Sequence, residues 1–384
     1  MEEENVKNTT ITMATRGMTR TLNSSDSAKS DQSLLDSQLP ILYTYITLMI
    51  FTSLVGTVGN IVVIVAVVTS KKLRVLQNVF IINLAVADLL VTALVNPFAV
   101  IGALDMGKLF YRLPALCEFI ATMVVTSCGC SIWSISAVSV NRYIYICHRV
   151  IYSKIYNQRT LPFMVIGLWL IAFLLDLPNY LGWGDHIFDT RQLLCNYDYS
   201  YNLSYTRYHL IALGVIVPVC VLCYSYFRIF MTFRSSSRRM RQHATNPSSS
   251  QKEKPQTADR RVLKTVAIIC IVFLVMWTPY SIIVVFDLHY QFWWFLLASF
   301  MAFTNSSVNF LVYAIDRNFR QAYSDIWKRI VSRCDCLVTK SDAIVTTGRK
   351  KTGSDVNDEI TESSGNTNVA FESSMTSNVT SNYL

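Results

Sequence analysis

Charged side chains are scarce in this sequence, and long stretches contain none or only one. Asp, Glu, Lys and Arg make up 15% of the 384 residues, whereas apolar residues make up 52%. Seven such stretches are long enough, at about 1.5 Å of rise per residue, to cross the roughly 30 Å hydrocarbon core of a bilayer. They comprise residues 41–68, 79–104, 119–140, 161–182, 208–227, 265–286 and 291–315. Because lipid offers no partners for backbone polar groups, this scarcity predicts an all-α membrane protein, a bundle of seven transmembrane helices.

Other absences exclude whole classes of function. Neither internal repeats nor inverted halves are visible, and no span has a polar pore face, which argues against a transporter or a channel. No cluster of metal ligands and no nucleophile beside a base is visible, which argues against an enzyme. The first 39 residues lack the apolar core of a signal peptide, so the first span is expected to start its own insertion.

Basic residues are distributed unevenly between the connections that join the spans. One alternate set of connections holds 17 Lys and Arg residues, and the other set holds four. The basic set comprises residues 69–78, 141–160 and 228–264, and the other comprises 105–118, 183–207 and 287–290. By the positive-inside rule the basic set is cytoplasmic. The sequence therefore predicts a multi-pass plasma-membrane protein with its N-terminus outside. The distribution of the basic residues among the connections also argues against reading the net charge of +9 as a sign of a nucleic-acid partner.

The regions outside the bundle are polar. The expected organisation is an extracellular disordered tail at 1–39, the bundle at 40–315, an amphipathic cytoplasmic helix at 316–333 and a disordered cytoplasmic tail at 334–384. Glycosylation sequons on the predicted outer side begin at Asn8, Asn23 and Asn202.

The ten cysteines do not form a disulfide framework, because most of them lie in or beside the spans. Only Cys117 and Cys195 face an oxidising compartment, so these two can pair. Cys334 and Cys336 follow the amphipathic stretch and are candidates for palmitoylation, which would hold that stretch on the inner leaflet. The alternative is that these two cysteines are unmodified, reduced thiols.

Polar residues within the spans mark a candidate ion site. Asp88 lies in the middle of the second span, Ser131 in the middle of the third, and Asn305 and Asn309 one helical turn apart in the seventh. One carboxylate among neutral oxygens suits an allosteric Na⁺ ion, and it also suits a proton. The third alternative is that Asp88 binds no ion and only forms hydrogen bonds that stabilise the packing of the helices.

At this point the chain resembles the rhodopsin family (class A) of G-protein-coupled receptors over about residues 40–333. The resemblance is carried by motifs in every span, taken in order. They are Gly59-Asn60, Asp88, Cys117, Asn141-Arg142-Tyr143, Trp169, Pro218, Tyr226, Phe273, Trp277, Pro279, Asn305, Asn309 and Tyr313. A receptor of this family implies an extracellular ligand and a heterotrimeric G protein as partners, with arrestin and a receptor kinase at the tail.

The resemblance also implies how the switch operates. Pro279 kinks the sixth helix, so rotation near Trp277 can swing its inner end outward. Arg142, beside Asn141 and Tyr143, would then bind the C-terminal helix of the G protein. The remaining switch residues are Asp259, expected to pair with Arg142 at rest, and Asn309, Tyr226 and Tyr313, of which the two tyrosines support the open form.

Within the family the chain looks most like melatonin receptors, which implies coupling to Gi/o. The shared features are the run from Asn141 to His148, Leu177-Pro178-Asn179, Asn318-Phe319-Arg320 and the absence of a seventh-helix proline at Phe310. Among ligand contacts, Asn179 and Tyr197 match, whereas Tyr199 and Gly214 replace a glutamine and a histidine. A related small-molecule ligand is therefore favoured over melatonin itself.

Two ligand classes are excluded by single residues. An opsin requires a seventh-helix lysine near Phe303, and an amine receptor requires an aspartate at Val124. The expected ligand pocket comprises Val124, Cys128, Asn179, Tyr197, Tyr199, Gly214, Trp277, Tyr280 and Phe303. A peptide-binding receptor of the same class and a receptor-like scaffold that no longer couples remain as alternatives.

Overall fold

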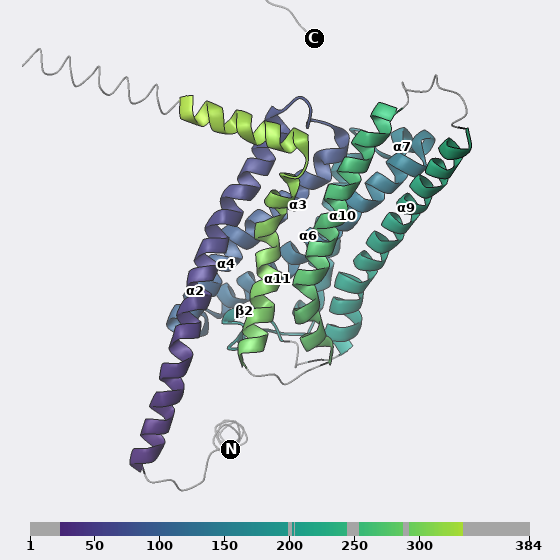
Figure 1. Ribbon diagram of the computed structural model, residues 1–384. Helices are drawn as coiled ribbons and strands as arrows, with labels where there is room; N and C mark the ends of the chain where they lie inside the picture. The colour runs from purple at the N-terminus through teal and green to yellow at the C-terminus, as the bar shows by residue number, and fades with distance from the viewer. Residues whose placement is uncertain (1–23, 199–201, 203, 244–252, 287–291, 333–384) are drawn as a thin grey trace, which may run out of the picture. The chain divides into compact units, whose positions relative to one another are not determined.

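The structure is a computed structural model of the chain and describes residues 24–198, 202, 204–243, 253–286 and 292–332. Among these residues, seven helices are long and apolar enough to cross a membrane, which confirms the predicted fold class. The bundle lies within one compact unit, Met1–Ile326 (Figure 1).

Two of the seven spans contain a segment of a different helical type. The helices in chain order are α2 (Ser24–Thr69), α3 (Val79–Leu90) continued by η2 (Val91–Val95) and α4 (Asn96–Asp105), α6 (Pro114–Cys147), α8 (Thr160–Tyr180), η3 (Tyr205–Ile216) continued by α9 (Val217–His243), α10 (Glu253–Phe286) and α11 (Phe292–Tyr313). Short helices lie between them at η1 (Leu76–Asn78), α5 (Lys108–Arg112) and α7 (Arg149–Ile155). A last helix follows at residues 317–332.

Two helices extend beyond the uncharged segments that predicted them. The helix α6 begins at Pro114, a favourable first position, and ends at Cys147, so it includes Arg142 at its inner end. The helix α2 begins at Ser24, inside the segment expected to be a disordered tail. Pro40 lies inside α2 at this junction, so the helix continues past a residue that cannot donate a backbone hydrogen bond, and residues 24–39 before it contain neither glycine nor proline.

The segments η2 and η3 are π-helical, and each ends two residues before a proline. The prolines are Pro97 and Pro218. A proline has no N–H to donate to the carbonyl four residues earlier, so the preceding turn loses one α-helical hydrogen bond. The wider π turn pairs the remaining groups differently, and such turns occur often at functional sites.

The helix α6 is the centre of the bundle. Its buried residues lie on all sides, and it contacts α3, α8, α9 and the loop strands. Three hydrophobic clusters surround it, and Trp277 of α10 packs against all three. Movement of this indole therefore affects the packing of all three clusters.

A β-hairpin closes one end of the bundle. The strands β1 (His186–Asp189) and β2 (Leu194–Tyr197) pair antiparallel, with His186 opposite Tyr197. The hairpin packs against the α4–α5 turn, where Gly107 has φ +78° and an added Cβ would lie 2.3 Å from the Phe188 ring. Only glycine fits that turn without moving the ring.

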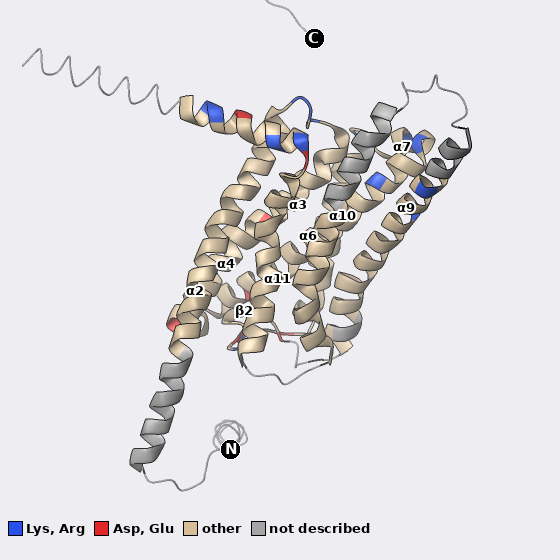
Figure 2. Ribbon diagram, viewed as in Figure 1, with Lys and Arg blue, Asp and Glu red and all other residues tan. Residues whose placement is uncertain are grey.

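Lys and Arg gather at the opposite end from this hairpin. Figure 2 shows them in blue near α7 and at the start of the last helix, within residues 317–326. The long middle of the bundle shows almost none, as the sequence pattern requires.

Candidate functional site

A small cavity lies between α6, α8, η3, α10, α11 and the hairpin. Its volume is about 60 Å³. Seven of the nine residues expected to line a ligand pocket do line it: Val124, Cys128, Tyr197, Gly214, Trp277, Tyr280 and Phe303. They come from four different helices and from β2, so the fold brings together residues that are far apart in the sequence.

The cavity wall is apolar except for a few hydrogen-bonding groups. The hydroxyls of Tyr197 and Tyr280 lie 3.0 Å apart and join the hairpin to α10. Burial raises the pKa of Tyr197 well above its ordinary value, so this loop hydroxyl stays neutral. The Oγ atoms of Ser281 and Ser299 and the Nε1 atom of Trp277 are buried and have no hydrogen-bond partner within the described residues. Such groups are available to a ligand.

Two expected contacts are not part of this cavity. Asn179 does not line it, because its Nδ2 atom donates to Asp176 Oδ1 at 2.8 Å and to the Tyr205 hydroxyl at 2.9 Å. Its Oδ1 atom is buried without a hydrogen-bond partner within the described residues, and the role of Asn179 as a ligand contact stays a prediction. Tyr199 lies outside the described residues.

The contact between Asp176 and His186 was not expected from the sequence. The Asp176 carboxylate is fully buried in α8, and His186 Nε2 of β1 lies 3.0 Å from its Oδ1 atom. A lone aspartate near the outer end of a span was the available signal, since a buried carboxylate requires a partner.

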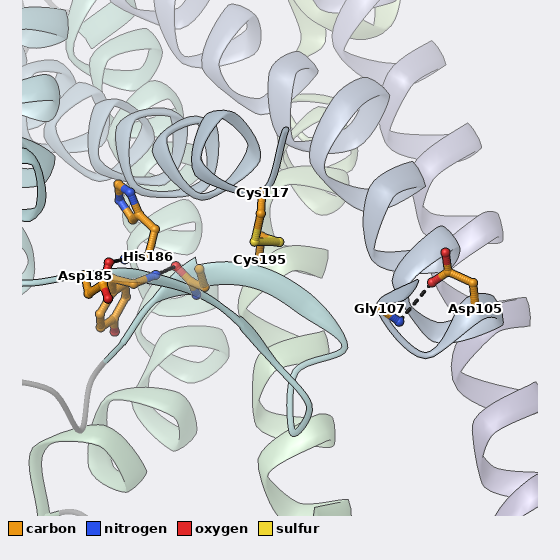
Figure 3. The surroundings of a disulfide bond; sticks show 8 residues. Asp105, Gly107, Cys117, Asp185, His186 and Cys195 are labelled. Atoms are coloured by element: carbon orange, nitrogen blue, oxygen red, sulfur yellow. Dashed lines mark hydrogen bonds between the residues drawn. A yellow bond between two sulfur atoms is a disulfide. The ribbon is translucent and has the colours of Figure 1, made fainter. Parts of the chain in front are cut away.

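The hairpin is anchored at a second point by the predicted disulfide. Cys117 at the start of α6 is bonded to Cys195 in β2, with their Cα atoms 5.2 Å apart. Figure 3 shows this bridge beside His186 on the neighbouring strand. Cys195 is completely buried, and the next two residues, Asn196 and Tyr197, line the cavity. The hairpin thus forms the outer wall of the cavity.

Two of the three expected partners of Asp88 contact its carboxylate. Ser131 Oγ donates to Asp88 Oδ1 at 2.8 Å, and Asn309 Nδ2 donates to Asp88 Oδ2 at 2.6 Å. Asp88 is fully buried, and the buried Oδ1 atom of Asn305 has no hydrogen-bond partner within the described residues. One carboxylate with spare acceptor capacity and a free amide oxygen is a donor set that fits a small hard cation.

Trp277 lies between the cavity and the inner half of the bundle. It stacks on Phe273 with ring centroids 5.9 Å apart and meets Tyr280 edge-on at 6.1 Å. Pro279 lies inside α10 two residues further on, where it removes a helical hydrogen bond. A ligand that displaces the indole would therefore act where α10 bends most easily.

A second cavity opens at the basic end of the bundle. It has a volume of about 150 Å³, and its wall includes Arg142 and Tyr313. Arg142 donates to the side-chain oxygens of Gln77 and Asn78 and is nearly buried. Sequence reasoning expected Asp259 as its partner. Residue 259 falls within α10, but its side chain is outside the described part of the structure.

The neighbours of Arg142 contact the connection that follows α6. Asn141 Nδ2 donates to the Tyr152 hydroxyl of α7 at 3.3 Å, and the Tyr143 hydroxyl lies 2.9 Å from His148 Nε2. Tyr226 of α9 packs against the same core cluster as Tyr313. The structure thus brings together most of the predicted switch residues at one end.

The predicted modification sites lie mostly beyond the described chain. Asn8, Asn23, Cys334 and Cys336 are outside it. Asn202 is described, and its Oδ1 atom accepts hydrogen bonds from the N–H and the hydroxyl of Ser204, at 3.0 and 2.8 Å.

Comparisons with known proteins agree with this arrangement. The profile of the "7 transmembrane receptor (rhodopsin family)" matches residues 59–313. The melatonin receptor type 1A of Mus musculus is 32% identical over 75% of this chain and 80% of its own length. The melatonin receptor type 1C of Xenopus laevis is 30% identical over 84% of this chain and 74% of its own length.

The fold has a match among solved structures. Squid rhodopsin superposes with a TM-score of 0.67 over 77% of this chain and 87% of its own, at 24% identity. The relatives are receptors rather than enzymes, and their family resides in the plasma membrane as multi-pass proteins. The chain belongs to the rhodopsin family of seven-transmembrane receptors and is similar to the melatonin receptors within it.

Proposed function

We propose that this receptor binds a small molecule in the cavity beneath the hairpin and activates a heterotrimeric G protein at the basic end. The observation that carries the proposal is the position of Trp277, which lines the cavity and packs against all three hydrophobic clusters. A ligand that prefers one position of the indole shifts the whole bundle toward one state, and the G protein prefers the same state.

The proposed orientation places the hairpin outside and the basic end inside the cell. The positive-inside rule supports it, since Arg and Lys gather around α7 and at the start of the last helix, within residues 317–326. A disulfide in the hairpin also fits an oxidising compartment. The G protein, arrestin and a receptor kinase would then meet the receptor from the cytoplasm, where palmitoylation of Cys334 and Cys336 would add a contact with lipid.

We further propose coupling to Gi/o and an allosteric Na⁺ ion. The relatives at about 30% identity are named melatonin receptors, and that similarity supports the coupling class. Asp88, Ser131, Asn305 and Asn309 would hold the ion, which stabilises the resting state through its charge. Melatonin is a less favoured ligand than another small apolar molecule, because Gly214 and Tyr199 replace expected contacts and Asn179 is engaged by Asp176 and Tyr205.

A cell-based G-protein activation screen over indoles, fatty-acid derivatives and peptides tests the proposal. An activating small molecule should lower cyclic AMP, and pertussis toxin should block the response. Arg142→Ala should abolish the response while ligand affinity stays within a few-fold, because Arg142 lies at the other end of the bundle from the cavity. Activation by peptides alone would favour the peptide-receptor alternative, and normal signalling by a surface-expressed Arg142→Ala would refute the coupling site.

A further inference from the structure

The cavity lies next to a groove on the outer surface of the bundle. This groove lies between η3 and α9 on one side and α10 on the other, and its volume is about 260 Å³. Four residues line both spaces: Ile211, Val215, Trp277 and Ser281. Large exposed side chains on the wall of the groove, among them Ile216 and Ile282, lie in membrane-spanning helices and therefore face lipid.

The cavity alone is too small for an ordinary ligand. Pockets for drug-sized molecules have volumes of about 300–1,000 Å³, whereas the cavity offers about 60 Å³. Cavity and groove together approach the lower end of that range. The outer route is covered by the hairpin, since Cys195 is fully buried and Asn196 and Tyr197 form the wall.

The chemistry of the two spaces differs in a consistent way. None of the described residues that line them is charged. The cavity wall holds buried polar atoms of Trp277, Ser281 and Ser299 that have no hydrogen-bond partner within the described residues. Trp277 and Ser281 also border the groove, but the rest of the groove wall is apolar apart from Thr278, whose hydroxyl is already bonded to Leu274 O at 2.5 Å.

We propose that the ligand is a neutral single-chain amphiphile that enters from the bilayer, with its head group in the cavity and its alkyl chain in the groove. This inference rests on the proposed receptor function and names the ligand class of the same site. A small head such as a primary amide donates to and accepts from the two serine hydroxyls, and it accepts from the indole N–H. A carboxylate or ammonium head would lose its hydration without gaining a counter-charge.

Photolabelling of the full-length receptor in phosphatidylcholine nanodiscs tests the proposal without any G protein. The probe is a long-chain primary amide with a diazirine midway along its chain and a terminal alkyne. We expect cross-links on the groove face of α9 and α10. The same chain with a carboxylate head should label these positions at least several-fold less.

Variants of matched size identify the head-group contacts. Ser281→Ala and Ser299→Ala should each lower labelling roughly fivefold, the effect of losing one neutral hydrogen bond. Thr278→Val, on the same groove, should leave labelling unchanged because the lost hydroxyl was bonded within its own helix. A thermal melt and a size-exclusion profile confirm that each variant is folded.

Equal labelling of the parent and both serine variants would overturn the proposal, and so would equal labelling by the carboxylate probe, because the groove would then hold any acyl chain. Loss of G-protein activation with intact head-selective labelling would instead refute the proposed coupling. Signalling by a charged or water-soluble agonist without head-selective labelling would keep the receptor function and refute the lipid route.

Discussion

Asp88 is the most constrained side chain of the inner bundle, because it is fully buried and accepts hydrogen bonds from Ser131 and Asn309. We expect Asp88→Asn to abolish the dependence of agonist affinity on Na⁺, since the substitution removes the charge that holds the ion. The measurement compares Na⁺ with a bulky organic cation at fixed ionic strength, so that screening is constant. Equal Na⁺ sensitivity in parent and variant would remove the case for the site.

Arg142 is restrained by neutral partners within the described chain, the side-chain oxygens of Gln77 and Asn78. We expect Gln77→Ala to raise ligand-independent signalling a few-fold, because the contact with Arg142 is lost, and Gln77→Glu to lower it, because a carboxylate in place of the amide oxygen forms an ion pair with the guanidinium. The readout is basal nucleotide exchange per receptor at the cell surface. If both variants match the parent, helix packing rather than this contact holds the resting state.

Single residues show where sequence reasoning stops. Asp88, Ser131 and Asn309 could be grouped in advance because an intramembrane carboxylate is rare and needs partners. Gln77 gave no such signal, since an uncharged amide beside a helix end is common and only the packing of η1 against α6 brings it to Arg142. The contact of Asn179 with Tyr205 likewise depends on tertiary packing, whereas its contact with Asp176 follows from their spacing of three residues in one helix.

Among the elements, the hairpin depends most on its covalent anchor. The Cys117–Cys195 bridge closes a loop of 78 positions, and the chain-entropy model assigns such a constraint roughly 4 kcal/mol. Cys195→Ser should therefore reduce surface expression and ligand binding severely. Cys223→Ser is the control, because Cys223 is a free and exposed cysteine of α9. Normal surface levels of Cys195→Ser would show that Asp176 and His186 anchor the strand sufficiently.

The elements were predictable in type but less so in their limits. Uncharged runs identified all seven spans, because lipid permits few alternatives. They missed the terminal turns of α6 and the first turns of α2, because charged and polar residues end an uncharged run without ending the helix. They also missed η2 and η3, because a π turn has no distinct hydrophobic period; only the following prolines indicated a local change.

At the scale of the whole molecule, the uneven distribution of positive charge determines the proposed orientation. An epitope tag at the N-terminus should be stained by antibody on intact cells, whereas a tag at the C-terminus should require permeabilisation. Each tagged chain is the control for the other. Staining of the C-terminal tag on intact cells would reverse the orientation and move the proposed G-protein site outside.

The whole fold could be foreseen because seven spans in order with family motifs leave one architecture. The ligand could not, since its cavity is built by residues from six elements whose side chains meet only in the bundle. The link between cavity and groove also depends on how η3 and α10 pack.

Because η3 is π-helical, it contains more residues per turn than a regular α-helix would. Each π turn holds one residue more than an α turn, so a one-residue deletion there can be absorbed by rewinding to α. Deleting lipid-facing Leu213 should thus preserve α9 and surface expression, while turning Leu210 and Ile211 away from the cavity. Deleting Leu170 from the regular helix α8 should instead rotate one side of the break by about 100° and prevent folding. Comparing the two deletions by surface expression tests whether length can vary in η3 without loss of the fold.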